Sequence, residues 1–538
     1  MRQINFTALI MIILIWVLVV LAIIGLYFRR VYTHFARAGV NSKPGIPPLG
    51  NLWKATFKKF HFSYVLEEIY NAFPDDRFVG FYELLSPIIL LKDIELIKQI
   101  TVKDFDVFLD HRIIINEKID PLFGSNLLSL KGQKWKDMRS TLSPAFTSSK
   151  MRLMVPFMVE VGDQMIVSLK NRMKKQKIDF LDIEMKDLTT RYANDVIATC
   201  AFGIKVDSVN DEDNEFYKMG KIASTFTFVH LVKMFGFASI PRLRVKLFPE
   251  KVGNFFKRIV LDTMKNREIH NIIRPDMIHL LMEAKKGNLR HDNKVSDEDA
   301  GFATVEESAV GTTSVKRAWS DNDLVAQALL FFIAGFDGVA SVTSVLLYEL
   351  AFNPDCQEKL VQEIKEVEKR GGEFDYNTVQ NMKYLDMLVS EVLRKWPPGS
   401  AGDRIAIKSY NIGKPNSQAT EDYIIRKGQG VFIPTWCIHH DPKYYENPYK
   451  FDPERFSDKN KHKIKPFTYI PFGVGPRNCI GSRFALCEVK VMIYQIIQHM
   501  EVLPCEKTCI PATLSPDSFN LSLKGGHWLR IRSRNTIE

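Results

Sequence analysis

One helical pattern limits the folds open to this chain of 538 residues more than any other feature. It runs from Asp321 to Phe352, follows Ser320, a good N-cap, and ends before the Asn-Pro pair at 353–354. A helix of this length would be about 48 Å long. Its middle, 329–345, is apolar on nearly every side, which predicts burial rather than a surface position. The chain therefore needs a large body that surrounds this helix.

Helical periodicity dominates the remaining chain as well, and strand-like patterns are short. Apolar residues recur three and four positions apart in three further segments, 180–202, 357–369 and 483–500. Runs typical of strands occur at 76–91, 403–407, 430–434 and 521–531. The most polar interruption, 285–320, carries mixed charges and is expected to form a long surface loop. The predicted fold class is mainly α with minor β-sheets, without a clear internal domain boundary.

Composition and charge narrow the possible functions. Hydrophobic residues make up 46% and charged residues 25%, which excludes a disordered, collagen-like or multi-span membrane protein. The net charge of +11 is compatible with a nucleic acid, an anionic membrane surface or an acidic protein partner. No recognised motif or stacking aromatics accompany the lysines, so nucleic-acid binding is not expected. Seven cysteines, an odd number without the spacing of a disulfide framework, indicate a reducing compartment.

The N-terminal segment carries a strong membrane signal. No charged residue occurs from 6 to 28, and about 20 apolar residues are enough to span a bilayer as a helix. The run is longer than the apolar region of a cleaved signal peptide and ends at a poor cleavage site. Basic residues follow it at 29, 30, 37 and 43, whereas only Arg2 precedes it. This asymmetry predicts that the bulk of the chain is cytosolic.

We therefore expect three parts, a membrane anchor at 1–30, a proline-rich linker at 31–50 and a globular domain at 51–538. The prolines at 44, 47 and 48 forbid a helix and stiffen the backbone of the linker. This linker is either a plain connector or a fixed strut that sets the tilt of the globular domain on the membrane.

The centre of the long helical pattern contains a carboxylate that does not suit a buried helix. Asp337 lies between Gly335 and Gly338 in the apolar stretch. A buried carboxylate is costly without a partner, and each glycine in mid-helix costs about 1 kcal/mol. These residues indicate either a local packing defect or a widened or kinked turn beside a bound group.

The stretch 471–481, Pro-Phe-Gly-Val-Gly-Pro-Arg-Asn-Cys-Ile-Gly, is the most informative part of the sequence. Its glycines and prolines predict a tight loop, and a helical pattern begins just after it. Cys479 is thus expected at a helix N-terminus, where amide donors and the helix dipole lower the pKa of a thiol. A stabilised thiolate can be a nucleophile or a metal ligand. No second cysteine or histidine stands at zinc-ligand spacing, which leaves a single axial thiolate to a large planar cofactor.

The pattern Phe472-x-x-Gly475-x-Arg477-x-Cys479-x-Gly481 resembles the haem-binding signature of cytochrome P450. Further motifs resemble those of the same family and occur in its order, namely Trp135-x-x-x-Arg139, Ala334-Gly335-Phe336-Asp337, Glu391-x-x-Arg394 and Pro453-Glu454-Arg455-Phe456. The resemblance covers residues 30–535 and implies the family's helical prism, here with an N-terminal transmembrane anchor. Segments 191–195 and 274–278 resemble insect microsomal members of detoxifying type.

The resemblance implies a role for each motif. Cys479 is the expected ligand of the iron in haem b. The other expected cofactor-binding residues, which shield the thiolate or neutralise the haem propionates, are Trp135, Arg139, Arg404, Phe472, Arg477 and Gly481. The expected catalytic residues of the oxygen-binding turn are Ala334, Gly335, Asp337 and Gly338. A buried structural network is expected from Glu391, Arg394 and Arg455.

The oxygen-binding turn departs from the family at one position. A threonine usually follows the acidic residue, whereas this chain has Gly338, which carries no hydroxyl. Ordered water can replace such a hydroxyl. The expected function is then a monooxygenase that inserts one oxygen atom from dioxygen into lipophilic small molecules, xenobiotics among them. Two alternatives stay open, a haem-thiolate enzyme that rearranges peroxides without a reductase, and a non-catalytic binder of haem or lipophiles.

The resemblance also implies partners and a location. Electrons from NADPH would arrive through an acidic flavoprotein reductase that docks on a basic face with Lys131, Lys134, Lys136, Lys459, Lys461, Lys463 and Lys465. A phenylalanine cluster at 226–237 is expected over the substrate entrance and at the lipid membrane. The expected location is the endoplasmic reticulum membrane, with a single-pass anchor and a cytosolic catalytic domain.

Overall fold

A computed structural model describes residues 6–112, 120–225, 249–286, 301–312, 317–371 and 374–534, together with positions 115, 117 and 246. The phenylalanine cluster at 226–237 lies outside the described residues, as do 287–300 and 313–316 of the expected surface loop.

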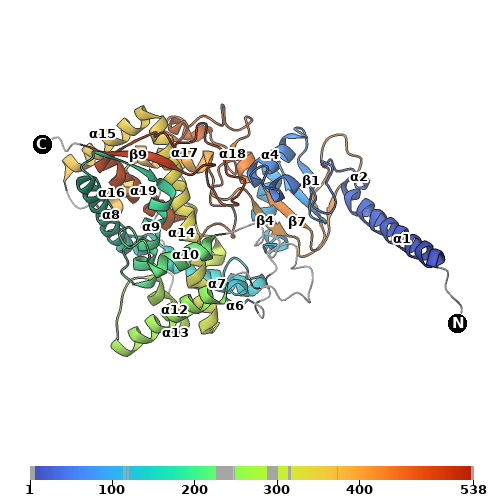
Figure 1. Cartoon of the computed structure of the whole chain (residues 1–538), viewed down its shortest axis with the longest axis horizontal. Helices are drawn as coiled ribbons and strands as arrows, with labels where there is room; N and C mark the ends of the chain where they lie inside the picture. The colour runs from blue at the N-terminus through green and yellow to red at the C-terminus, as the bar shows by residue number, and fades with distance from the viewer. Residues whose placement is uncertain are drawn as a thin grey trace.

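Helices form most of the described chain. The first half contains α1 (Phe6–Tyr32), α2 (His34–Arg37), α3 (Trp53–Thr56), α4 (Phe62–Asn71), α5 (Ile94–Lys98), α6 (Pro121–Gly124), α7 (Gly132–Leu142), α8 (Ser148–Gln176), α9 (Met185–Ile197) and α10 (Glu215–Ser224). The second half contains α12 (Glu250–His270), α13 (Met277–Lys286), α14 (Asp321–Phe352), α15 (Pro354–Arg370), α16 (Tyr376–Asn381), α17 (Lys383–Lys395), α18 (Thr435–His439) and α19 (Ser482–His499). Figure 1 shows α8, α9, α14 and α19 gathered in one half of the molecule. The mainly α fold class is therefore confirmed.

Three small sheets complete the fold. The largest has the strand order β1 (Phe78–Glu83), β2 (Ser86–Leu91), β7 (Gly430–Ile433) and β4 (Gly402–Ile405). Only its β2–β7 pair is parallel. The second sheet joins β3 (Phe180–Glu184), β9 (Trp528–Ser533) and β8 (Met500–Leu503), and the third joins β5 (Tyr410–Asn411) and β6 (Ile424–Ile425). In Figure 1 the four-stranded sheet lies at the end of the molecule opposite most of the helices.

Helix α1 projects beyond this sheet, away from the remaining chain (Figure 1). Its segment Ala8–Tyr32 is long and apolar enough to cross a membrane, and none of its most apolar stretch is buried. Only the end of the helix is fixed to the sheet, where the Tyr32 hydroxyl donates to the carbonyl of Leu84 (2.8 Å) and its ring packs on Tyr82. An apolar helix that the protein itself does not cover is compatible with a membrane anchor.

Helix α14 is buried and begins and ends where the sequence predicts. Ser320 forms a capping box with Asp323, because its hydroxyl accepts from the Asp323 amide while the Asp323 carboxylate accepts from the Ser320 amide. The helix is α-helical over its whole length, so a widened turn at its centre is not found. Helix α9 packs alongside it, and the Thr189 hydroxyl donates to the carbonyl of Ala340 (3.0 Å).

Three predicted elements differ from the structure. The expected helix at 180–202 begins only at α9, because Phe180–Glu184 forms strand β3 and pairs with β9, far away in the sequence. The strand expected at 521–531 begins only at Trp528. The described part of the expected surface loop is also not a free loop, since Ala303 and Gly311 are buried in it.

Candidate active site

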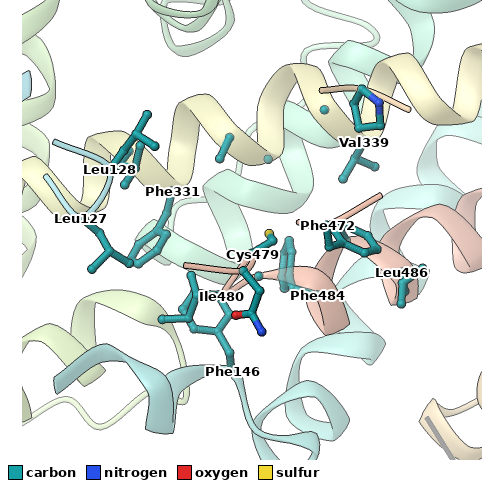
Figure 2. Close-up of a pocket in the computed structure, with 18 of the residues that line it drawn as sticks. Leu127, Leu128, Phe146, Phe331, Val339, Phe472, Cys479, Ile480, Phe484 and Leu486 are labelled. Atoms are coloured by element: carbon teal, nitrogen blue, oxygen red, sulfur yellow. The ribbon is translucent and has the colours of Figure 1, made fainter. Parts of the chain in front are cut away.

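A cavity of about 490 Å³ lies between α14 and the loop that precedes α19. Figure 2 shows the sulfur of Cys479 directed toward α14 within a ring of apolar side chains. The apolar lining includes Leu127, Leu128, Phe146, Phe331, Val339, Phe472, Ile480, Phe484 and Leu486. Polar or amphipathic side chains enter the lining at His111, Trp135, Arg139, Arg477 and Asn478.

The loop before α19 reaches the cavity through a tight backbone turn. Gly475 has a φ of +72°, and a Cβ atom at this position would lie 2.0 Å from the carbonyl oxygen of Thr101. Only glycine suits both conditions. The amide of Cys479 donates to the carbonyl of Phe472 (2.8 Å), which closes the turn. Cys479 is thereby held just ahead of the first turn of α19.

The sulfur of Cys479 is accessible from the cavity and enclosed by the protein around it. Burial raises the pKa of this thiol, and a hydrogen bond from the Gly481 amide and the charge of Arg139 lower it by less. The expectation that the helix N-terminus lowers this pKa is therefore wrong for the free side chain, because desolvation outweighs the nearby donors. A coordinating metal ion deprotonates a thiol outright, so a metal ion bound by Cys479 would produce the thiolate without the help of the helix.

Arg477 brings a buried guanidinium to the edge of the cavity. It donates to three backbone carbonyls of segment 109–130, at 2.8, 3.2 and 2.8 Å. The same group lies 4.0 Å from the ring centroid of Trp135, which fixes the plane of the fork. Burial, together with the neighbouring charge of Arg404, lowers the pKa of Arg477 to about 9.

Arg404, on β4, is a second buried guanidinium near Arg477. It donates to the carbonyls of Asp403 (2.7 Å) and Val474 (3.4 Å), and its Nε has no acceptor among the described residues. Burial lowers the pKa of Arg404 to about 10. The carboxylate of Asp110 lies 3.5 Å from Arg477, and the other polar contacts described for the two guanidiniums are with neutral carbonyls. Two buried cations with so little compensation favour a further anionic group in their vicinity.

The opposite wall of the cavity is formed by α14 and includes three small residues, Ala334, Gly335 and Gly338, among larger apolar ones such as Phe331 and Val339. A Cβ atom at Gly335 would lie 2.7 Å from Cδ1 of Ile197, so this glycine allows α14 and α9 to approach each other. A Cβ atom at Gly338 would meet no described atom within 4 Å. The first glycine therefore serves helix packing, while the second leaves open space in the wall.

The site thus combines a cysteine directed into an apolar cavity with a long buried helix opposite it. Comparison of the sequence with known proteins identifies the family. The family model of Cytochrome P450 matches residues 41–528. The chain belongs to the cytochrome P450 family. Cytochrome P450 9e2 of Blattella germanica is 43% identical over 94% of this chain and 96% of that protein. Probable cytochrome P450 9f2 of Drosophila melanogaster is 42% identical over 93% and 95%, and cytochrome P450 6k1 of Blattella germanica is 37% identical over 93% of each chain.

As a P450, the protein is a monooxygenase with a haem-thiolate iron cofactor, and NADPH supplies its electrons through a reductase. The cavity fits this cofactor in shape and chemistry. Its lining is mainly apolar and includes a cysteine sulfur and the guanidiniums of Arg139 and Arg477. Arg404 does not line the cavity but lies beside Arg477, so buried positive charge is available for the two carboxylates of a haem. The Arg404 Nε, which lacks an acceptor among the described residues, is a donor that such a carboxylate would satisfy.

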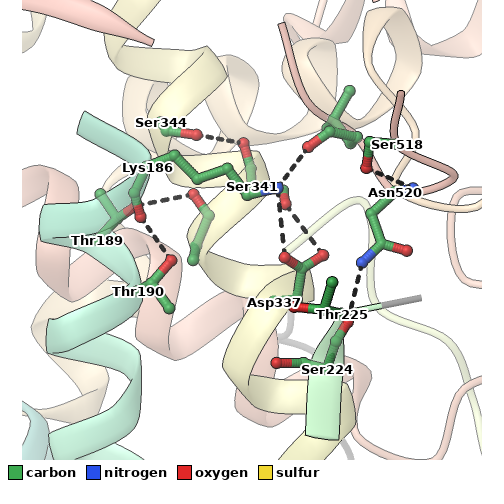
Figure 3. Close-up of polar contacts among 12 residues, drawn as sticks. Lys186, Thr189, Thr190, Ser224, Thr225, Asp337, Ser341, Ser344, Ser518 and Asn520 are labelled. Carbon is green, nitrogen blue, oxygen red and sulfur yellow. Dashed lines mark hydrogen bonds and ion pairs between the residues drawn. The ribbon is translucent and has the colours of Figure 1, made fainter. Parts of the chain in front are cut away.

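Asp337, predicted to be catalytic, lies behind the wall of the P450 cavity and does not line it. Its carboxylate lies 3.3 Å from Nζ of Lys186 on α9 and 3.4 Å from Oγ of Ser341. Figure 3 shows this contact, with Asp337 among polar side chains of α9 and of the loop that contains Ser518. Successive helical residues are rotated by about 100°. Gly338 therefore faces the cavity while Asp337 faces Lys186.

Two contacts of the cavity residues were not predicted. Arg139 donates to the carboxylate of Glu307 through Nε (3.1 Å) and Nη2 (2.7 Å). Glu307 lies in the expected surface loop, where no local pattern distinguishes it from its neighbours. His111 lines the cavity, with its Nδ1 2.9 Å from Oδ1 of Asp403, and burial lowers the pKa of the ring.

Glu391 and Arg394 of α17 form a fully buried ion pair. Nε and Nη2 of Arg394 donate to the two carboxylate oxygens at 2.7 and 2.8 Å. Nε of Arg455 lies 3.6 Å from the same carboxylate, and the amide of Asp452 donates to it at 2.9 Å. None of these groups lines the cavity, so the arrangement links elements of the scaffold.

Several of the lysines expected to bind the reductase are paired within the protein. The pairs, each with a nitrogen–oxygen distance below 3 Å, are Lys134 with Glu117, Lys136 with Asp106 and Lys461 with Asp458. Lys463 contributes a further contact to the side chain of Asn460 (2.8 Å). Neighbouring acidic residues therefore neutralise part of the expected basic face.

A second cavity, of about 460 Å³, adjoins the first and shares Leu128, Leu330 and Ala334 with it. Its lining comes largely from the segment that follows α1 and α2 and from the loop near residue 519. The apolar residues of this lining include Leu49, Leu52, Phe60, Phe62, Phe123, Phe432 and Phe519. The two cavities are therefore neighbours, and the second reaches from this outer segment to Ala334 on the wall of α14.

Proposed function

We propose that this P450 is a membrane-anchored enzyme that inserts one oxygen atom from dioxygen into lipophilic small molecules, xenobiotics among them. The observation that carries the proposal is the pair of apolar cavities that meet at Ala334, above Cys479. A molecule that fills these cavities must give up its hydration over most of its surface, which favours apolar substrates.

The membrane supports the same choice of substrate. We infer that residues 1–30 anchor the chain in the endoplasmic reticulum membrane, that 31–50 form the linker and that 51–538 form the cytosolic catalytic domain. The exposed apolar helix α1 and the basic residues that follow it support this topology. The lining of the second cavity includes Leu49, at the end of the linker, and Leu52, just after it. A compound dissolved in the bilayer would therefore have a short apolar route into the enzyme.

We assign the cofactor-binding roles to the residues around the first cavity. Cys479 ligates the iron, and Phe472 and Gly481 enclose its sulfur. Arg139, Arg404 and Arg477 would neutralise the propionates, and Trp135 would help to hold them. The haem, when bound, supplies the activation of dioxygen, which a thiolate ligand favours. The chain contributes the orientation of this group and the exclusion of water from the sulfur.

The residues of α14 divide the remaining tasks. Ala334, Gly335 and Gly338 line the side where small molecules bind, and the open volume at Gly338 can hold ordered water in place of the absent hydroxyl. Asp337 acts from behind the wall, through its contacts with Lys186 and Ser341, rather than by touching a substrate. Glu391, Arg394 and Arg455 keep the scaffold on the cysteine side in place.

For the reductase we infer a docking area on the cysteine side that includes the seven lysines at 131, 134, 136, 459, 461, 463 and 465. Three of them are already paired with acidic residues, so their contribution to docking requires exchange of partners. Lys131, Lys459 and Lys465 are the first positions to test.

The proposal is tested in membranes that contain the full-length protein and a reductase. NADPH and a panel of lipophilic compounds are added, and oxygenated products are measured, with a Cys479→Ala protein as the control. Product that depends on NADPH and reductase supports the monooxygenase. Turnover of hydroperoxides without reductase would favour peroxide rearrangement. This alternative is tested because Gly338 lacks the hydroxyl that usually occurs at this position in the family. Haem binding without any product would leave a non-catalytic binder.

A further inference from the structure

The described residues 301–312, which we call the strap, lie across the cysteine side of the P450. At the start of the strap, the ring of Phe302 packs edge-on against Phe456, with 5.1 Å between centroids. The Phe302 amide donates to Asp386 of α17 (3.0 Å). At its end, a short helix, Ala309–Thr312, packs beside α7. The strap therefore runs from α17 to α7, the helix that carries Arg139.

The middle of the strap forms hydrogen bonds with Arg139 and with Asn478, two residues close to the expected thiolate. Glu307 accepts from Nε and Nη2 of Arg139, and the carbonyl of Glu306 accepts from Nδ2 of Asn478 (3.0 Å). Arg139 also donates to the carbonyl and to Oδ1 of Asn478, at 2.7 and 2.8 Å. Glu307, Arg139 and Asn478 thus form one connected unit, and Asn478 directly precedes Cys479 in the chain.

The donors of Arg139 are almost fully used by this unit. A guanidinium has five N–H groups. Glu307 and Asn478 occupy the Nε hydrogen, both Nη2 hydrogens and one Nη1 hydrogen, so one Nη1 donor is left among the described contacts. Because Arg139 lines the cavity, that donor can serve a haem carboxylate while Glu307 keeps its hold on the others.

The charges of this unit are shielded from water. The side chain of Arg139 is 3% exposed and that of Glu307 is 22% exposed. A charge pair in such surroundings interacts more strongly with its neighbours than an exposed pair does. Glu307 is therefore placed to offset a positive charge beside the cofactor. Glu306 is not, because its side chain is exposed.

We propose that Glu307 is a positioning residue of this P450, which fixes the fork of Arg139 and balances its charge beside the haem thiolate. The inference rests on the proposed cofactor-binding roles of Arg139 and Cys479. Reduction adds one electron to the haem, and an uncompensated cation nearby favours the reduced state. Loss of the Glu307 charge should therefore make the haem easier to reduce.

The test compares Glu307→Gln with Glu306→Gln in the full-length, haem-loaded protein. Glutamine keeps the length and one carbonyl acceptor but removes the charge. Glu306 is the matched control because it is adjacent and exposed, and because it meets Asn478 through its backbone carbonyl, which the substitution retains. The readouts are the midpoint potential, measured by spectroelectrochemistry, and the rate of haem transfer to an apo-globin acceptor.

We expect Glu307→Gln to shift the ferric–ferrous equilibrium toward the ferrous form by about threefold or more at a fixed potential. Haem transfer should become faster, Glu306→Gln should resemble the wild type, and Glu307→Asp should return the potential toward the wild-type value. Equal potentials in all variants would overturn the proposal, as would equal shifts at 306 and 307.

If Glu307→Gln does not retain haem, Glu307→Asp decides the matter. If the aspartate variant retains haem, the charge of Glu307 is what matters and the proposal is supported. If both variants lose haem, position 307 is required for packing and the proposal is overturned. A wild type without a thiolate-ligated haem spectrum would instead contradict the proposed function.

Discussion

The two walls of the P450 cavity are built in different ways. The wall that carries Cys479 is a loop whose atoms are held by a closed turn, buried guanidiniums and a glycine in the left-handed region. The opposite wall is an uninterrupted helix that presents Ala334, Gly335 and Gly338 to the cavity. The first wall has many polar contacts of fixed direction, and the second has none from these three side chains.

This difference separates two tasks. A wall with directed donors can hold a large cofactor in one orientation, and each lost partner leaves a buried charge without compensation. A wall of small residues leaves room for dioxygen, water and substrate. The effect of a larger side chain at one of its positions depends on the space around that position. Substitutions on the first wall should therefore cause losses of cofactor or fold, and those on the second should mainly alter packing and the yield of the reaction.

The largest effect is expected from Cys479→Ala on the first wall. This substitution removes the sulfur that the resemblance assigns to the iron. The reduced carbon-monoxide spectrum typical of a haem thiolate should therefore disappear. Cys487→Ala, in the same helix region but with a fully buried side chain, should keep that spectrum. A thiolate-type spectrum in the Cys479→Ala protein would disprove the assignment of the ligand.

The next largest effect concerns the scaffold behind this wall. Glu391→Gln leaves Arg394 buried without its anionic partner, and we expect a loss of about 3–5 kcal/mol in the free energy of unfolding. Chemical denaturation monitored by circular dichroism measures it. The exposed helical pair of Glu366 and Arg370, 3.9 Å apart, provides the control, and Glu366→Gln should have no measurable effect. Similar stability of the two variants would show that the buried pair is not required.

The two glycines of the second wall should respond to alanine with opposite signs. Gly338→Ala meets no described atom and should gain about 1 kcal/mol from helix propensity. Gly335→Ala has the same gain, but the tip of Ile197 must move, and overpacking costs about 1–3 kcal/mol. Thermal unfolding of the two variants side by side gives the comparison. Equal stabilities would mean that Gly335 is not needed for the contact between α14 and α9.

The smallest change in stability, about 0.3 kcal/mol in favour of the variant, is expected from Gly338→Thr. Its hydroxyl would stand where ordered water is proposed, so more product should form per NADPH consumed and less peroxide should be released. Gly338→Val has nearly the same shape without the hydroxyl and is the control. If both variants improve the yield of product per NADPH equally, the effect comes from filled space and not from the hydroxyl. If the wild type already converts nearly all NADPH into product and neither variant improves this yield, position 338 has no role in proton delivery.

Local sequence patterns were sufficient for the elements that are fixed by local physics. The limits of α14 follow from the cap at Ser320 and the proline at 354, and the turn before α19 follows from its glycines. The orientation of Asp337 could not be predicted, because a helix that is apolar on every side does not mark which face meets the cavity. Its partner, Lys186, comes from another helix and leaves no trace in the local pattern.

Long-range pairing explains the other differences. Segment 180–184 becomes a strand because β9 pairs with it, which its own periodicity does not indicate. Glu307 looked like one acid in a polar loop, and its contact with Arg139 joins positions separated by 168 residues. The free pKa of the Cys479 thiol was also misjudged, because the sequence shows the helix that follows but not the extent of burial.

The central claim is that this cavity activates dioxygen and transfers one of its atoms to a lipophilic substrate. Turnover with NADPH, reductase and isotopically labelled dioxygen, followed by mass spectrometry of the product, tests it directly. We expect one labelled oxygen atom per product molecule and none in the product of the Cys479→Ala protein. Product without the label, or product formed from a hydroperoxide in the absence of reductase, would contradict the account.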